Sequence, residues 1–69
     1  MSVYKVIELV GTSATSWEDA AKTAVETAAK SVRDLRVAEV TELDLQLDDG
    51  QVAAYRAKVK VSFKHEASD

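Results

Sequence analysis

Residues 3–13 read Val-Tyr-Lys-Val-Ile-Glu-Leu-Val-Gly-Thr-Ser and residues 16–21 read Ser-Trp-Glu-Asp-Ala-Ala, and these two stretches decide the fold. The first is rich in strand-forming residues without helical spacing, and Gly-Thr-Ser at its end stops the strand. Ser16 is a good helix N-cap, and Glu18 and Asp19 place negative charge in the first helical turn, where the helix dipole favours it. One strand therefore turns directly into one helix, which we expect to begin at about Trp17.

The segment after this cap has the pattern of an amphipathic helix. Charged residues lie on one face of it, and the apolar residues recur with helical spacing on the other. The spacing predicts a helix of about 18 residues whose apolar stripe packs on a sheet. The stripe is made of Trp17, Ala21, Ala24, Val25, Ala28, Val32 and Leu35.

From Val37 the hydrophobic period changes to two, which is typical of strands. Leucines at 43, 45 and 47 alternate with acidic and polar residues, and after Asp48-Asp49-Gly50-Gln51 a second alternating run ends at Phe63. This pattern predicts a β-hairpin with one apolar and one charged face. If the leucines share a face with Tyr55, opposite residues must have the same parity.

That parity fixes the register we expect in the hairpin. It brings oppositely charged residues face to face across the two strands, and such pairs help to fix register. A plain two-residue Asp49-Gly50 turn would break the parity, so we predict a three-residue loop with a glycine bulge, or a longer loop. The predicted pairs are Leu45 with Tyr55, Leu43 with Ala57, Asp44 with Arg56 and Glu42 with Lys58.

The predicted fold class is α+β, with a single β-α-β-β domain over residues 1–69. A helix that returns the chain makes the second strand parallel to the first, so a wholly antiparallel sheet needs the third strand between them, in the order 1-3-2. Both outer strands are then long edges, and the first strand is apolar on both faces. Exposed edges and surplus apolar surface in so small a chain predict obligate self-association.

Composition narrows the classes of function. The chain has 69 residues, no cysteine and one histidine, His65, which excludes disulfide frameworks and thiolate zinc sites. A core this small stabilises a fold only marginally, so we expect self-association or an oxygen-ligated cation to add stability. The formal net charge of −3, with interspersed signs, argues against nucleic-acid and membrane partners. No signal peptide or membrane span is evident, so we expect a cytoplasmic protein. No nucleophile, base or phosphate-binding loop points to an enzyme.

The chain resembles the dodecins. The resemblance rests on the opening residues 3–13, on Glu39-Val40 after the helix, and on the closing Tyr55 and Val59-Lys60-Val61-Ser62-Phe63. It implies a β-α-β-β subunit whose sheet partly wraps the helix, a hollow homododecameric shell, and a small ligand or ion in place of catalysis.

The resemblance also implies a ligand pocket, and this chain departs from the flavin-binding pattern there. In flavin-binding dodecins a tryptophan just after the helix clamps FMN or riboflavin; Val37 stands at that position. Arg56 stands where the family has a glutamine, and Glu42 aligns with the polar rim of the pocket. Valine cannot provide the stacking of an indole, so we expect weak flavin binding. Trp17, the only tryptophan, is interpreted as a core or subunit-contact residue.

Val37 and Arg56 together with the residues that open the helix look most like the calcium-binding branch of the dodecins. Calcium takes six to eight oxygen ligands, and Glu42 and Asp44 are our candidate metal ligands. The alternative interpretation is that these carboxylates form a surface charge ladder with Lys58 and Arg56. Three classes of function stay open: an ion-binding shell, a flavin-storing shell, and an assembly without a dedicated small ligand.

Overall fold

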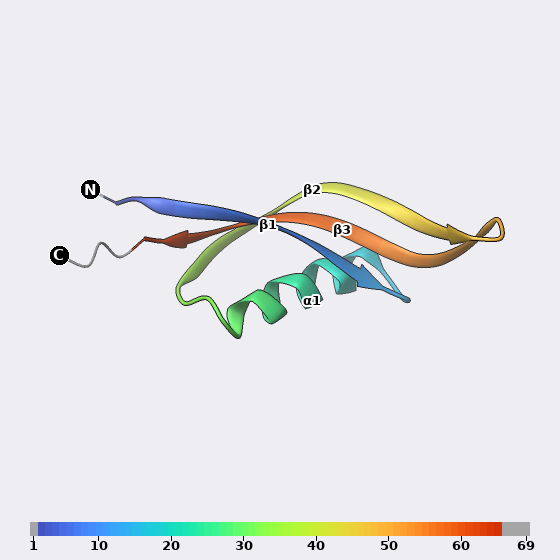
Figure 1. The fold of residues 1–69 in the computed structure, drawn as a ribbon, viewed down its shortest axis with the longest axis horizontal. Coiled ribbons are helices and arrows are strands. Elements are labelled where there is room, and N and C mark those ends of the chain that lie inside the picture. The colour runs from blue at the N-terminus through green and yellow to red at the C-terminus, as the bar shows by residue number, and fades with distance from the viewer. Residues whose placement is uncertain (1, 66–69) are drawn as a thin grey trace.

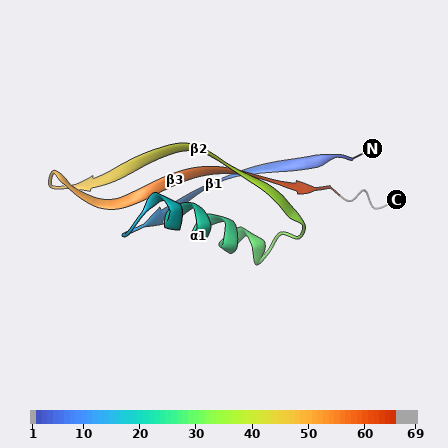
Figure 2. The same cartoon turned by 180° about the vertical axis from the view of Figure 1, so that it is seen from behind.

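The computed structural model describes residues 2–65; residue 1 and residues 66–69, the two ends of the predicted domain, lie outside them. It contains β1 (Tyr4–Ser13), α1 (Trp17–Ala29), β2 (Leu35–Asp48) and β3 (Gln51–Lys64). The strands form one antiparallel sheet in the order β1-β3-β2, which confirms the predicted fold class and strand order. Helix α1 lies on one face of this sheet, and the opposite face, called the open face below, carries no helix (Figures 1 and 2). No helix within residues 2–65 has the length and apolarity needed to span a bilayer.

The start of α1 is as predicted. Ser16 is the N-cap, with extended backbone geometry, and its side chain accepts a hydrogen bond from the Asp19 backbone N–H at 3.0 Å. The Asp19 carboxylate accepts a hydrogen bond from the Ser13 hydroxyl at 2.8 Å, and the same hydroxyl oxygen accepts the Thr15 backbone N–H at 3.0 Å. The end of β1 is thereby tied to the first turn of α1 through the buried side chain of Ser13.

The end of α1 differs from the prediction. The helix contains 13 residues and ends at Ala29, so Val32 and Leu35 are not part of it. Asp34 has φ 62°, a left-handed conformation that no helix continues through, and Leu35 begins β2 opposite Phe63. Apolar spacing overestimated the length because an apolar residue that starts a strand can continue a helical pattern.

The core is built from small side chains. Its buried helix residues are Ala20, Ala24 and Ala28, four apart along one face, and Ala20 was not in the predicted stripe. The strand β3 supplies the rest of the buried core, which consists of Ala57, Val59 and Val61. Small side chains let the helix approach the sheet closely, but they leave little apolar area to bury.

Gly11 sits at the closest approach of α1 to β1. A Cβ atom built on Gly11 would lie 2.1 Å from the Ala20 carbonyl oxygen and 2.9 Å from the Ala24 Cβ. Both contacts are shorter than atoms tolerate, and the first is with backbone, which cannot rotate away. The absence of a side chain at Gly11 therefore sets the distance between helix and sheet.

The register of the hairpin confirms the prediction, whereas its turn does not. All four predicted cross-strand pairs are present. The turn is the plain two-residue Asp49-Gly50 connection between Asp48 and Gln51, and both turn residues have positive φ, 53° and 75°, as type I′ hairpins require. Parity is restored by an irregularity between Gln46 and Leu47, where Ala53 has no partner on β2. The bulge lies in the strand and not in the loop.

The folded chain is elongated. Its radius of gyration is 14.2 Å, whereas a compact chain of this length has about 11 Å. Its accessible surface is 5240 Å², against about 4,200 Å² for a typical folded monomer of this mass. The folded chain therefore exposes about 1,000 Å² more than a typical monomer of its mass.

We expect Gly11→Ala to lower the free energy of unfolding by about 1–3 kcal/mol, because the new methyl group forces the helix off the sheet. The control is Gly50→Asn, since a Cβ at Gly50 meets nothing within 4 Å and asparagine tolerates positive φ. Thermal unfolding followed by circular dichroism measures both variants. Equal midpoints for Gly11→Ala and the wild type would contradict the close approach described above.

Candidate functional site

The candidate site residues all lie on the open face of the sheet. The cross-strand rows place acidic residues of the two outer strands beside basic residues of the central strand β3. Glu8 and Glu39 flank Lys60, Glu42 lies opposite Lys58, and Asp44 lies opposite Arg56. The open face thus carries a ladder of alternating charge, with its positive charges in the middle.

Asp44 and Arg56 form the best-ordered pair of this ladder. Arg56 donates two parallel hydrogen bonds to Asp44, from Nε to Oδ1 at 2.7 Å and from Nη2 to Oδ2 at 2.9 Å. This bidentate contact lowers the pKa of the Asp44 carboxyl below its usual value of 3.8 and raises the pKa of Arg56, in both cases chiefly through the hydrogen bonds. Both side chains are about half exposed. Asp44 is ionised at neutral pH, and both of its oxygens already have a donor.

Glu42 is held less firmly than Asp44. The Lys58 ammonium lies 3.0 Å from Glu42 Oε1, and the Glu42 side chain is 65% exposed. This contact raises the pKa of Lys58, with smaller contributions from the charges of Glu8 and Asp44. Next to Glu42 the ladder shifts register between Val40 and Glu42, and the Thr41 hydroxyl donates to the Lys58 carbonyl at 3.2 Å. Of the two candidate metal ligands, Glu42 is the one with freely accessible oxygen.

Val37 lies at the other end of the open face. It is 62% exposed, stands opposite Ser62, and lines a shallow depression with Val6, Glu39 and Lys60. Arg56 is six residues from Ser62 along β3, which places it about 20 Å away at 3.3 Å per residue. The three candidate pocket residues, Val37, Glu42 and Arg56, therefore do not form one pocket within a single chain.

The candidate metal ligands do not form a complete site within one chain either. Glu42 and Asp44 are alternate residues of one strand, so their side chains leave the sheet about 7 Å apart. Among residues 2–65, no group of three or more histidine, cysteine, aspartate or glutamate side chains is placed to hold a metal ion. The oxygens of this face fit calcium in type, but these two carboxylates alone do not supply the six to eight oxygens that calcium takes.

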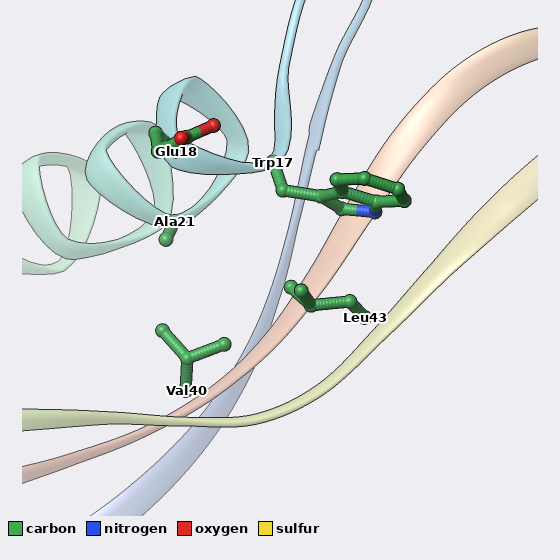
Figure 3. A pocket seen from close by; sticks show the side chains of 5 residues that line it. All are labelled: Trp17, Glu18, Ala21, Val40 and Leu43. Atoms are coloured by element: carbon green, nitrogen blue, oxygen red, sulfur yellow. The ribbon is translucent and has the colours of Figure 1, made fainter.

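A groove on the opposite side of the sheet, under the start of α1, was not predicted. It is lined by Trp17, Glu18, Ala21, Val40 and Leu43 (Figure 3). The Trp17 indole donates from Nε1 to the Asp44 carbonyl at 3.0 Å and meets the Tyr55 ring edge-on, with centroids 5.2 Å apart. The predicted pairing of Leu45 with Tyr55 already placed an aromatic ring on the helix side of the sheet, but its contact with the first helical residue requires the three-dimensional fold.

A family model described as Dodecin matches residues 3–66. The chain belongs to the dodecin family. Among curated dodecins, the calcium dodecin of Mycobacterium tuberculosis is 56% identical over 64 residues, covering 93% of this chain and 90% of the relative.

Solved dodecin structures share the fold. The crystal structure of the calcium dodecin of M. tuberculosis, described as calcium chelating and as having a novel calcium-binding site, matches with a TM-score of 0.85 at 53% identity over 99% of this chain and 97% of the other. The dodecin of Streptomyces coelicolor matches with a TM-score of 0.90 at 39% identity, over 97% and 96% of the two chains. These matches confirm the resemblance to dodecins seen in the sequence and the similarity to the calcium-binding branch.

Proposed function

We propose that this chain is the subunit of a non-catalytic homododecameric dodecin shell that binds calcium. The single observation that carries the proposal is the 56% identity to a calcium dodecin along nearly the whole chain. The open face supports it, because its donors are carboxylate and hydroxyl oxygens, the ligands that calcium prefers. The elongated shape and the excess surface support assembly, because a core of alanines and valines buries too little apolar area to stabilise the subunit alone.

The assembly is predicted to be a discrete particle. We expect light scattering to give a mass near twelve times the 7.5 kDa of one chain at micromolar concentration. The physical reason is that the folded monomer leaves two sheet edges and its excess apolar area in water. A monodisperse species of one or two subunits would refute this part of the proposal.

Glu42 is the carboxylate that we propose as a calcium ligand, with Asp44 in a secondary role. Both carboxylate oxygens of Asp44 accept hydrogen bonds from Arg56, so a cation at Asp44 would have to displace the guanidinium from two contacts at once. At Glu42 the competing cation is Lys58, a single flexible ammonium with one contact to Oε1. Calcium binding then requires Lys58 to move away and oxygens from a second copy to complete the coordination.

This competition gives two variants with opposite effects. Glu42→Gln removes the ligand, so calcium should no longer raise the midpoint of thermal unfolding. Lys58→Gln removes the competing cation and should tighten calcium binding. In the wild type we expect the free energy of unfolding to rise by about 2.7 kcal/mol when free calcium is one hundred times the dissociation constant, because only the folded assembly has the site.

The measurement is scanning calorimetry of the wild type and variants, with calcium and with a chelator. Glu26→Gln is the matched control, since it makes the same charge change on an exposed helix position away from the open face. No calcium-dependent shift in the wild type would end the calcium proposal. A shift that persists in Glu42→Gln would place the ions elsewhere on the shell.

Flavin is the alternative ligand, and we expect it to bind weakly. Val37 offers no aromatic face, and stacking contributes about 1–3 kcal/mol per contact in the comparable nucleobase case. Arg56 is engaged by Asp44 and is not free to orient a ring. Titration with FMN, followed by fluorescence quenching, tests this. Val37→Trp combined with Arg56→Gln should recover part of the binding, and a submicromolar dissociation constant in the wild type would contradict the expectation.

A further inference from the structure

We propose that Trp17 is a positioning residue for the ion site on the open face. It holds Asp44 from the helix side, so that Asp44 stays engaged by Arg56 and Glu42 alone exchanges its ammonium partner for a cation. The inference rests on the calcium binding in the proposed function and adds the residue that decides which carboxylate is used. Trp17 contacts no open-face carboxylate and acts through the backbone of β2.

Asp44 is bonded from both sides of the sheet. Its main-chain carbonyl accepts the Trp17 indole N–H at 3.0 Å, and the indole reaches from the start of α1 with its nitrogen toward β2 (Figure 3). On the open face its carboxylate accepts two hydrogen bonds from Arg56, at 2.7 and 2.9 Å. Trp17 also contacts the ring of Tyr55, which directly precedes Arg56 on β3. One indole therefore holds Asp44 directly and Arg56 through its neighbour.

The stretch of β2 around Asp44 depends on this contact for its position. The register shifts between Val40 and Glu42 and again between Gln46 and Leu47, so residues 42–46 are a short regular stretch with an irregularity at each end. Asp44 is the middle residue of this stretch, and β2 is an outer strand of the sheet. Among residues 2–65, the bond from Trp17 is the only hydrogen bond that joins α1 to β2.

The start of α1 is a firm support for the indole. Trp17 directly follows the N-cap Ser16, and the first helical turn is tied to β1 by the hydrogen bond from Ser13 to Asp19. A side chain that is locked by packing and by a hydrogen bond of its own positions a neighbouring group more precisely than a free one does. The position of Asp44 is thereby set by the helix.

The hold on Asp44 matters because a second carboxylate lies close to it. Glu42 and Asp44 leave the open face about 7 Å apart. A cation that binds Glu42 releases Lys58, and the charge of Asp44 already contributes to the raised pKa of Lys58. In its own row Arg56 has Thr12 on one side and Asp44 on the other, so Asp44 is its only carboxylate partner there. Held by Arg56 and by Trp17, Asp44 takes no part in the exchange.

The first test measures tryptophan emission in the presence of a chelator. Trp17 is the only tryptophan, so the emission reports on it alone. Arg56→Gln removes the guanidinium that holds Asp44, and we expect the emission maximum to move to longer wavelength as the indole loses its acceptor and gains contact with water. The matched control is Lys60→Gln, the same charge change about 13 Å further along β3, which should keep the wild-type maximum. An unchanged maximum in Arg56→Gln, or equal shifts in both variants, would overturn the inference.

The second test measures calcium affinity by isothermal titration calorimetry. Trp17→Phe keeps an aromatic ring beside Tyr55 but removes the indole N–H, so Asp44 becomes available to the cation as a second carboxylate. We expect the calcium dissociation constant to fall about fivefold or more, the lower end of typical coupling between sites. In an Asp44→Asn background the same change should have no effect. A dissociation constant that does not fall in Trp17→Phe, or that falls equally in both backgrounds, would overturn the inference.

Failure of this inference is distinguishable from failure of the proposed function. A wild type that binds no calcium refutes the proposed function. A wild type that binds calcium with a dissociation constant that Trp17→Phe leaves unchanged refutes only the role of Trp17. Light scattering of each variant establishes that particles of equal mass are compared. The Arg56→Gln measurement retains Trp17 and uses no calcium, so it decides whether Trp17 holds Asp44 even where Trp17→Phe fails to fold.

Discussion

The closeness of α1 to the sheet is the constraint on which the rest of the subunit depends. Gly11 lets the helix approach β1 and β3 so closely that the only helix side chains buried against them are the alanines at 20, 24 and 28. Close packing of this kind gives a well-defined position of the helix but buries little apolar area. Larger apolar residues such as Ile7, Leu9 and Leu35 pack against the border of this core and are only partly buried, and Leu43, Leu45 and Leu47 stay 41–61% exposed.

The two faces of the sheet differ in composition: one is apolar and the other is charged. The helix side holds the core, and the open face holds the charge ladder in which β3 is basic and its neighbours are acidic. Because β3 is the central strand, Lys60 lies between Glu8 of β1 and Glu39 of β2, whereas Lys58 and Arg56 contact only Glu42 and Asp44 of β2. At the calcium site proposed for Glu42, a divalent cation would therefore have to displace the Lys58 ammonium, which lies 3.0 Å from Oε1.

The sequence predicted those features that depend on local patterns. Parity of the leucines and the opposite charges at 42, 44, 56 and 58 were enough to give the hairpin register, because a slip by one residue would move every leucine to the wrong face. The length of α1 was overestimated because Val32 and Leu35 continue the helical spacing, whereas Asp34 and the pairing of Leu35 with Phe63 end it. The candidate site was predicted only as a set of residues. Val37 and Arg56 are far apart in one chain, and a single sequence carries no spacing information about ligands that another copy would supply to the proposed ion site.

The unpaired Ala53 has a consequence for how this hairpin can vary. The bulge at Ala53 lies between the turn and the first charged row, Asp44 opposite Arg56, and so separates the geometry of the tip from the register of the strands. The turn can keep the tight Asp49-Gly50 geometry while the charged rows and the leucine row stay aligned further along the strands. Loss of Ala53 would invert the tip of the hairpin, residues 46–54, relative to the rest of the sheet, so that its polar and apolar side chains would exchange faces. The bulge thus compensates for the parity of the two-residue turn. A homologous chain with a longer turn could keep the same strand register without a bulge.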